Sequence, residues 1–148
     1  MPTPEDRINT MIALVNSSAS IANKNKSSIK IEFRQVNDVN GIAPPPRKNI
    51  LKILHSTRAL DSTLESFLDY HGIKGASHSI GQYISQLTNH TLSTLGKLSI
   101  QERTKYQNEI VIHRNKYLHK ANSYPLTDRD VYKLISEMEA LISRVVGL

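Results

Sequence analysis

Hydrophobic residues recur at spacings of three and four along most of the chain, which predicts a protein built from amphipathic helices. The first such stretch opens with Thr3 as an N-cap, Pro4 in the first turn and two acids after it, so we expect a helix to begin there. Its apolar stripe runs to about residue 22 and consists of Ile8, Met11, Ile12, Val15, Ala19 and Ala22. We expect this stripe to face the core.

Residues 23–47 follow a different pattern. Ile29, Ile31 and Phe33 alternate with charged residues, as the residues of a strand do. The stretch from 37 to 46 contains a glycine and three consecutive prolines, which predicts a loop or linker. A single strand would have no partner in the rest of the chain, so we expect an irregular segment that serves as a lone strand, a swapped arm or a lid.

Helical periodicity returns after the prolines. A long amphipathic helix is predicted from Lys48 to about Tyr70, and Gly72 is well placed to end it. A shorter helix follows over residues 80–87, where Gly81 weakens the pattern without breaking it.

Two capping signals mark the last two helices. Ser99 and Glu102 form a capping box, and an apolar stripe follows them. Pro125 breaks that helix, and Thr127 caps a final one. Together these segments predict an all-α, up-and-down bundle of about five helices in a single domain over residues 1–148.

Composition narrows the range of chemistry. The chain has 148 residues, 39% of them hydrophobic, and no apolar run approaches the roughly 18 residues that a membrane-spanning helix needs. Its N-terminus lacks the features of a secretory signal, so we expect a cytoplasmic protein. The absence of cysteine excludes disulfides, thiolate nucleophiles and cysteine-bound zinc. No metal and no cofactor are predicted, and the net charge of +6 favours a polyanionic partner.

Charged and polar side chains cluster near the end of the fourth predicted helix, over residues 113–120. Asn115 and His119 are four residues apart and therefore neighbours on one helix face. Arg114 and His119 are about 140° apart around the helix and about 7.5 Å apart along it, which a long arginine side chain can span. We therefore treat these three residues as the candidate catalytic group.

These residue types suit RNA cleavage. The planar guanidinium of Arg114 matches phosphate oxygens, and the imidazole of His119 exchanges protons near neutral pH. The amide of Asn115 can orient a hydroxyl or an oxyanion. RNA supplies its own nucleophile, the 2′-hydroxyl, so a base and a cation suffice without a metal.

The segment Arg114-Asn115-Lys116-Tyr117-Leu118-His119 resembles the signature of the HEPN superfamily, in which arginine is followed by four to six residues and then histidine, often with a polar residue directly after the arginine. The resemblance covers roughly residues 48–148 and includes the place of the motif, near the end of a long helix that a short loop joins to another.

The resemblance implies a homodimer whose two motifs face one cleft, and a metal-independent endoribonuclease that leaves a 2′,3′-cyclic phosphate. It implies that His119 is the acid-base residue and Arg114 the phosphate clamp. Lys116 and Lys120 are candidate RNA contacts. Many members are toxins or act in antiviral defence, so an antitoxin or another defence protein is a candidate partner. In members that a nucleotidyltransferase silences, tyrosine occupies the position where this chain has Ala121.

Two other classes of function stay open. A HEPN-like module can bind RNA, nucleotide or a protein without chemistry, and a helical antitoxin or adaptor can present a basic face to an acidic protein. His113 lies on the apolar stripe of its helix, so we expect it to pack in the core or an interface rather than to act in catalysis.

Overall fold

The structure is a computed structural model that describes residues 2–41, 45–119 and 127–148. Within these ranges the chain is all-helical and contains no strand. The elements are α1 (Pro4–Ser17), α2 (Asn23–Asp38), the 3₁₀ turn η1 (Val39–Gly41), α3 (Pro45–Tyr70), α4 (Ile80–Asn89), α5 (Ile100–Tyr106), the π-helical η2 (Gln107–Val111), α6 (Ile112–His119) and α7 (Asp128–Val146). In the described parts of the chain, no helix has the length and apolar character needed to cross a membrane.

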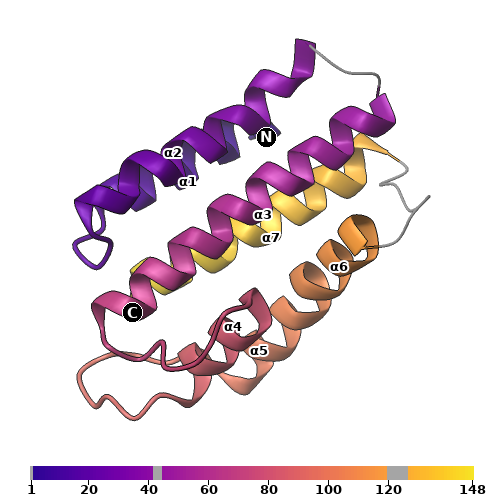
Figure 1. Ribbon diagram of the computed structural model, residues 1–148. Coiled ribbons are helices and arrows are strands. Elements are labelled where there is room, and N and C mark those ends of the chain that lie inside the picture. The colour runs from indigo at the N-terminus through magenta and orange to yellow at the C-terminus, as the bar shows by residue number, and fades with distance from the viewer. Residues whose placement is uncertain (1, 42–44, 120–126) are drawn as a thin grey trace.

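The helices form three layers (Figure 1). The middle layer is the pair α3 and α7, α1 and α2 cover one side of it, and α4 with the continuous helix α5–η2–α6 covers the other. Figure 1 shows α1, α3 and α7 running in one direction and α2 and α5–η2–α6 in the opposite one. The predicted all-α bundle is therefore confirmed, and one hydrophobic core joins the layers.

Capping chemistry fixes the helix ends where the sequence predicts them. Complete capping boxes start α1 at Thr3, α5 at Ser99 and α7 at Thr127. At the end of α3, Gly72 has a φ of 69°, and the amide of Ile73 donates to the carbonyl of Leu68 over 3.0 Å. This is a Schellman motif, which needs a residue that tolerates positive φ.

The predicted irregular segment at 23–47 is wrong over most of its length, because residues 23–38 form α2. Ile29, Phe33 and Val36 are buried, whereas Ile31 is 57% exposed. A short alternation of apolar residues also satisfies the spacing of four that a helix needs, and Val36 continues the helical stripe rather than the strand pattern. With α5–η2–α6 counted as one helix, the described residues form six helices instead of five.

The first helix is shorter than expected, since it ends at Ser17 and not near residue 22. Ser18 is extended, and its hydroxyl accepts a hydrogen bond from the amide of Ser20 over 3.2 Å. A side-chain oxygen thus replaces the backbone carbonyl that would accept from this amide in a helix. Ala19 is exposed, and Ile21, which is 2% exposed, anchors the turn in the core.

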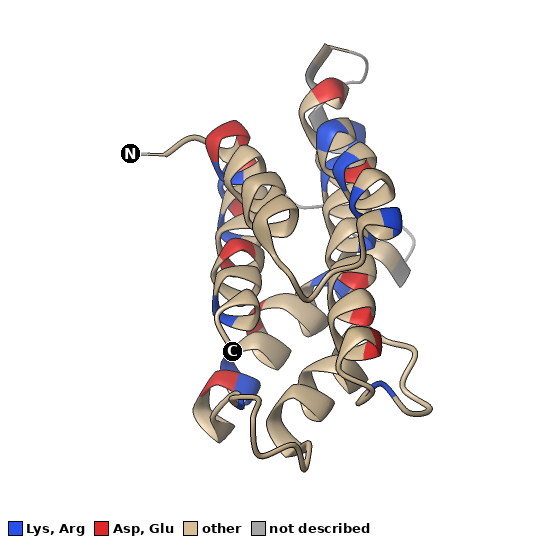
Figure 2. Cartoon of the chain, turned by 90° about the vertical axis from the view of Figure 1, so that its left-hand side faces the viewer, with Lys and Arg blue, Asp and Glu red and all other residues tan. Residues whose placement is uncertain are grey.

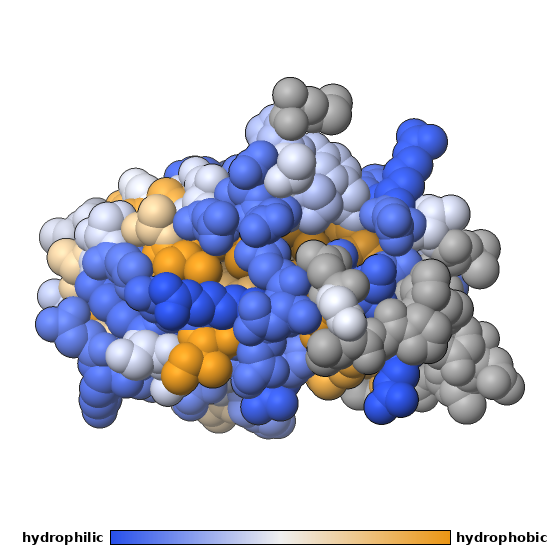
Figure 3. Space-filling model, turned by 90° about the horizontal axis from the view of Figure 1, so that it is seen from above, coloured by the Kyte–Doolittle hydropathy of each residue, from blue (hydrophilic) through white to orange (hydrophobic). Residues whose placement is uncertain are grey.

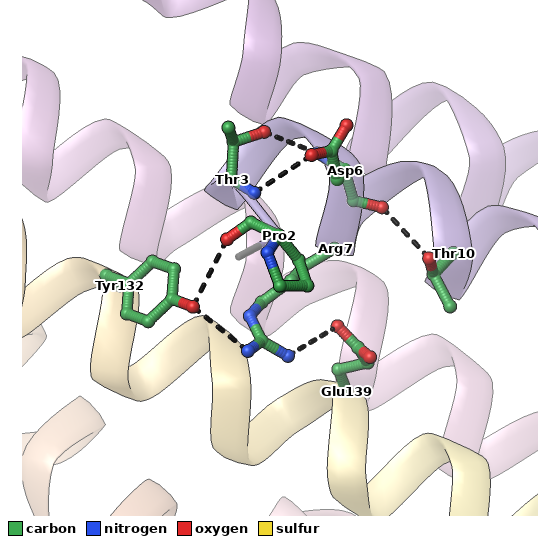
Figure 4. A network of polar contacts seen from close by, with 7 residues as sticks. All are labelled: Pro2, Thr3, Asp6, Arg7, Thr10, Tyr132 and Glu139. Carbon is green, nitrogen blue, oxygen red and sulfur yellow. Dashed lines mark hydrogen bonds and ion pairs between the residues drawn. The ribbon is translucent and has the colours of Figure 1, made fainter.

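A polar network ties the start of α1 to α7 (Figure 4). The guanidinium of Arg7 donates to Glu139 Oε2 over 3.1 Å and to the Tyr132 hydroxyl over 3.0 Å. The Tyr132 hydroxyl donates in turn to the carbonyl of Pro2 over 3.2 Å. This partly buried network holds the N-terminal segment against the last helix.

Charge is separated along α3. All of its lysines and arginines precede Asp61, and all of its other acids follow it. In the right-hand column of helices in Figure 2, which contains α2 as well as α3, blue predominates above and red below. Figure 3 shows apolar surface between polar residues on the face seen from above. Large hydrophobic residues that stay exposed among the described residues are Ile31, Tyr70, Ile100 and Ile112.

The assignment of α2 as a helix can be tested with a pair of substitutions. Phe33 is fully buried, so Phe33→Ala should lower the free energy of unfolding by about 3–5 kcal/mol. Ile31 is exposed, so Ile31→Ala should change it by less than about 0.5 kcal/mol. Urea denaturation followed by circular dichroism measures both. Equal losses for the two variants would support a strand, in which both residues share one face.

Candidate active site

The candidate motif lies on the helix that α5, η2 and α6 form together. A π turn interrupts this helix over Gln107–Val111, where the amide of Ile112 donates to the carbonyl of Gln107. The Gln107 side chain donates to the carbonyl of Gly81 on α4 over 2.9 Å. A Cβ at Gly81 would lie 3.3 Å from that side chain, so the glycine permits the close approach that holds the π turn.

The π turn changes which side of α6 faces the bundle. It inserts one residue into the helix, which corresponds to a rotation of about 100° relative to an uninterrupted α-helix. Tyr106 and Ile110 are buried before or within it, but His113 and Tyr117 are only partly buried after it. Tyr117 and Leu118 both pack against the core from partly buried positions. The rotation therefore moves the later part of the predicted apolar stripe, His113 and Tyr117, from the core to the edge of the contact between α6 and the rest of the bundle.

Arg114 is partly buried and Asn115 is exposed. An Nη atom of Arg114 donates to Asn115 Oδ1 over 2.9 Å, so the structure brings these two predicted residues together. Arg114 also attracts the carboxylate of Asp61 on α3, which places the guanidinium next to an acidic part of that helix. The attraction acts across the boundary between α6 and α3.

The acidic side of α3 opposite Arg114 is a polar cluster that sequence reasoning missed. Glu65 accepts a hydrogen bond from the Tyr83 hydroxyl over 3.1 Å and pairs with Lys74 over 3.2 Å. Burial, followed by the charge of Asp61, raises the pKa of Tyr83 and keeps its hydroxyl protonated. Asp61 and Glu65 are four residues apart beside an apolar stripe, and that spacing was the available signal.

The remaining predicted site residues are placed only in part. Lys116 is exposed, with Nζ 5.5 Å from the centre of the Tyr117 ring. His119 is the last residue of α6, one turn beyond Asn115, but its side chain lies outside what the structure describes. Lys120 and Ala121 lie outside the described residues. The structure thus unites Arg114 and Asn115, and the place of the imidazole stays a prediction.

The four histidines outside α6 have partners away from this site. His55 pairs with Glu32 over 3.0 Å, His71 bonds Ser20, His78 bonds a carbonyl in its own turn, and His90 bonds the carbonyl of Gly96. Within the described ranges, no group of three or more His, Asp or Glu residues is arranged to hold a metal ion.

Comparison with known proteins gives no match: no family model fits the chain, and no curated protein or solved structure is significantly similar to it.

The partial burial of the Asp61 carboxyl has a measurable effect on stability. Burial and the charge of Glu65 raise the pKa of Asp61, and Arg114 and Lys74 oppose them more weakly. A carboxyl whose folded-state pKa is raised contributes stability that is complete below its unfolded pKa and is lost as pH rises through the folded value.

Asp61→Asn should therefore have the same melting temperature as the wild type at pH 3 and a higher one at pH 7, since the amide cannot ionise. Differential scanning calorimetry at the two pH values measures this difference. A lower melting temperature of Asp61→Asn at pH 7 would mean that attraction to Arg114 outweighs the burial of the carboxylate.

Proposed function

We propose that this protein is a HEPN-like, metal-independent endoribonuclease with Arg114, Asn115 and His119 in its active site. The observation that supports it most is the hydrogen bond between Arg114 and Asn115 at the end of a long helix, one turn before His119. The net charge of +6 adds attraction for RNA. The motif resembles the HEPN signature in both spacing and place along the chain.

In the proposed reaction, the 2′-oxygen of RNA attacks the adjacent phosphorus. The bond from the 2′-oxygen to phosphorus forms, the bond from phosphorus to the 5′-oxygen breaks, and a 2′,3′-cyclic phosphate and a free 5′-hydroxyl result. His119 moves the proton between the 2′-hydroxyl and the leaving oxygen. Arg114 stabilises the charge on the phosphoryl oxygens, and Asn115 holds the guanidinium in place through its side-chain oxygen.

A homodimer completes this site in the proposal. On α6, Arg114 is partly buried and attracts Asp61 of α3, whereas Asn115 is exposed, and His119 follows it by one helical turn. Ile112 on the same helix is 57% exposed. An exposed apolar residue beside the motif supports an interface there, in which Arg114 of one subunit and His119 of the other line a common cleft.

The alternative is a HEPN-like module that binds RNA, nucleotide or a protein partner without cleaving RNA. The hydrogen bond between Arg114 and Asn115 is equally compatible with this alternative, because a restrained cation can bind a phosphate without any chemistry. Both proposals fit a toxin or an antiviral defence system, with an antitoxin or defence protein as a further partner.

The decisive measurement is incubation of purified protein with mixed cellular RNA in EDTA. We expect the wild type to produce fragments with 2′,3′-cyclic phosphate ends and His119→Ala to produce none, because the proton transfer is lost. His78→Ala removes an exposed histidine far from the motif in sequence and should cleave like the wild type. Circular dichroism should show unchanged helix content in both variants.

If the wild type binds RNA in a salt-sensitive manner but leaves it intact, the enzyme proposal is wrong and the binding module is supported. Loss of helix content in His119→Ala would instead assign that residue a structural role.

The role of the two parallel N–H donors of the Arg114 guanidinium can be tested separately from the role of its charge. Arg114→Lys keeps a cation but loses the planar pair of donors, so we expect about a 10- to 100-fold slower cleavage in EDTA. Arg103→Lys, on the same continuous helix, is the matched control and should cleave at the wild-type rate. Equal rates for Arg114→Lys and the wild type would mean that only the positive charge matters.

A further inference from the structure

A small cavity lies between the helix that carries the motif and the first half of α7. Its volume is about 100 Å³, and the side chains around it combine aromatic, acidic, basic and apolar chemistry. They belong to Glu109, His113, Tyr117, Asp130, Lys133 and Leu134. None of these residues has a role in the cleavage step proposed above, although His113 directly precedes Arg114.

Two aromatic rings form one side of the cavity. The rings of His113 and Tyr117 lie nearly parallel, with an interplanar angle of 22° and centroids 6.3 Å apart. Both side chains are partly buried, and Leu134, which is 3% exposed, supplies an apolar surface next to them. Flat ring faces beside an apolar side chain are suited to stacking with a planar ligand, as nucleobases stack on aromatic residues.

A carboxylate and an ammonium group lie side by side at the same cavity. Glu109 on η2 and Lys133 on α7 form an ion pair of 3.4 Å, and their side chains are 32% and 67% exposed. The cavity therefore offers an acceptor of two hydrogen bonds next to a cationic donor. The pair is solvent-accessible, so a ligand that satisfies both groups can replace it at little cost.

Asp130 is less available for a ligand. Its carboxylate accepts the backbone amide of Thr127 over 3.1 Å as part of the cap of α7. Burial, followed by the negative charge of Asp130, raises the pKa of Tyr117, so the phenol ring stays neutral at neutral pH. Of the two carboxylates at the cavity, Glu109 is thus the one that can accept hydrogen bonds from a ligand.

The polar pair matches one nucleobase best. The Watson–Crick edge of guanine presents the O6 acceptor next to two adjacent donors, N1–H and the N2 amino group. A carboxylate can accept from both donors while an ammonium donates to O6. Uracil offers a single donor on that edge, and adenine and cytosine place acceptors where guanine has N1–H.

We propose that this cavity binds the base of a guanosine nucleotide, with the ring against Tyr117 and His113 and its polar edge on Glu109 and Lys133. The volume admits the edge of a base and leaves the sugar and phosphate outside. Lys116 lies over the same Tyr117 ring, so a cation for the phosphate lies next to the cavity. The proposal rests on the ribonuclease function and gives it a preference for guanosine.

Direct binding of the four nucleoside 3′-monophosphates tests the proposal by isothermal titration calorimetry. We expect the wild type to bind 3′-GMP about tenfold more tightly than the other three, the range of discrimination that a bidentate contact gives. Glu109→Gln should lose this preference, because an amide cannot accept from both donors. Lys133→Gln, at an exposed position, should reduce it and serves as a second variant if Glu109→Gln does not fold.

The chain supplies a matched control for the carboxylate. Glu137 on α7 pairs with Lys105 on α5 over 3.5 Å, so it is an ion pair between the same two long helices but outside the cavity. Glu137→Gln should keep the preference for 3′-GMP. Equal binding of all four nucleotides by the wild type, or an unchanged preference in Glu109→Gln and Lys133→Gln, would overturn the proposal.

Cleavage separates this proposal from the ribonuclease function. A preference for 3′-GMP without any RNA cleavage would uphold the guanine site and reject the enzyme. Cleavage that depends on His119 but shows no preference for guanosine, together with equal nucleotide binding, would uphold the enzyme and reject the site.

Discussion

The helix α3 must be buried on two opposite sides, and the arrangement of the bundle follows from that constraint. It packs against α2 on one side and against α4 and α6 on the other, with α7 beside it. A helix in such a place has few positions left for polar residues. Ser56 and Thr63 are nevertheless fully buried, and each hydroxyl donates to a carbonyl of the preceding turn over 2.7 Å. Their polarity is therefore satisfied within α3, which leaves both faces free for apolar packing.

The π turn connects this packing to the candidate site. It is stabilised where Gln107 reaches across to Gly81, and both residues belong to the layer that covers α3. The rotation that it introduces turns Arg114 toward the acids of α3 and leaves His113 and Tyr117 at the boundary with α7. Without the extra residue, the stripe of Tyr106, Ile110, His113 and Tyr117 would face the core, and Arg114 would lie further toward solvent. The local backbone irregularity thus separates the side of α6 that carries Arg114 from the side that carries the rings of His113 and Tyr117.

Local signals explain which parts of the fold could be predicted. Thr3, Ser99 and Thr127 cap helices through bonds to residues three positions away, so the sequence alone predicts those ends. α2 could not be recognised in the same way, because Ala22 at its start makes no side-chain cap and Ile31 extends a short alternation. The hydrogen bond that joins Gln107 of the π turn to Gly81 connects two helices, and no local pattern shows such a contact.

In the candidate site, too, local features could be predicted from the sequence and contacts between helices could not. The spacing of Arg114, Asn115 and His119 within one helix is a local property, and the bond between the first two agrees with it. The cluster of Asp61, Glu65 and Tyr83 arises only when α3 and α4 come together. Sequence reasoning therefore found the residues on one helix and missed those that a neighbouring helix contributes.

The order of charges along α3 is unfavourable for the helix dipole. Arg47 and Lys48 lie in the first turn and Asp69 near the end, the reverse of what the helix dipole favours. Burial and the charge of Lys48 lower the pKa of Lys52, a further sign of crowded cations. Tertiary packing offsets these costs, since helix ends in a bundle depend more on burial than on the dipole. In Figure 1 the basic start of α3 lies at the same end of the molecule as the end of α6. The order of charges along α3 thus places its basic residues at the end of the molecule where α6 ends. The acids of α3 lie toward the opposite end.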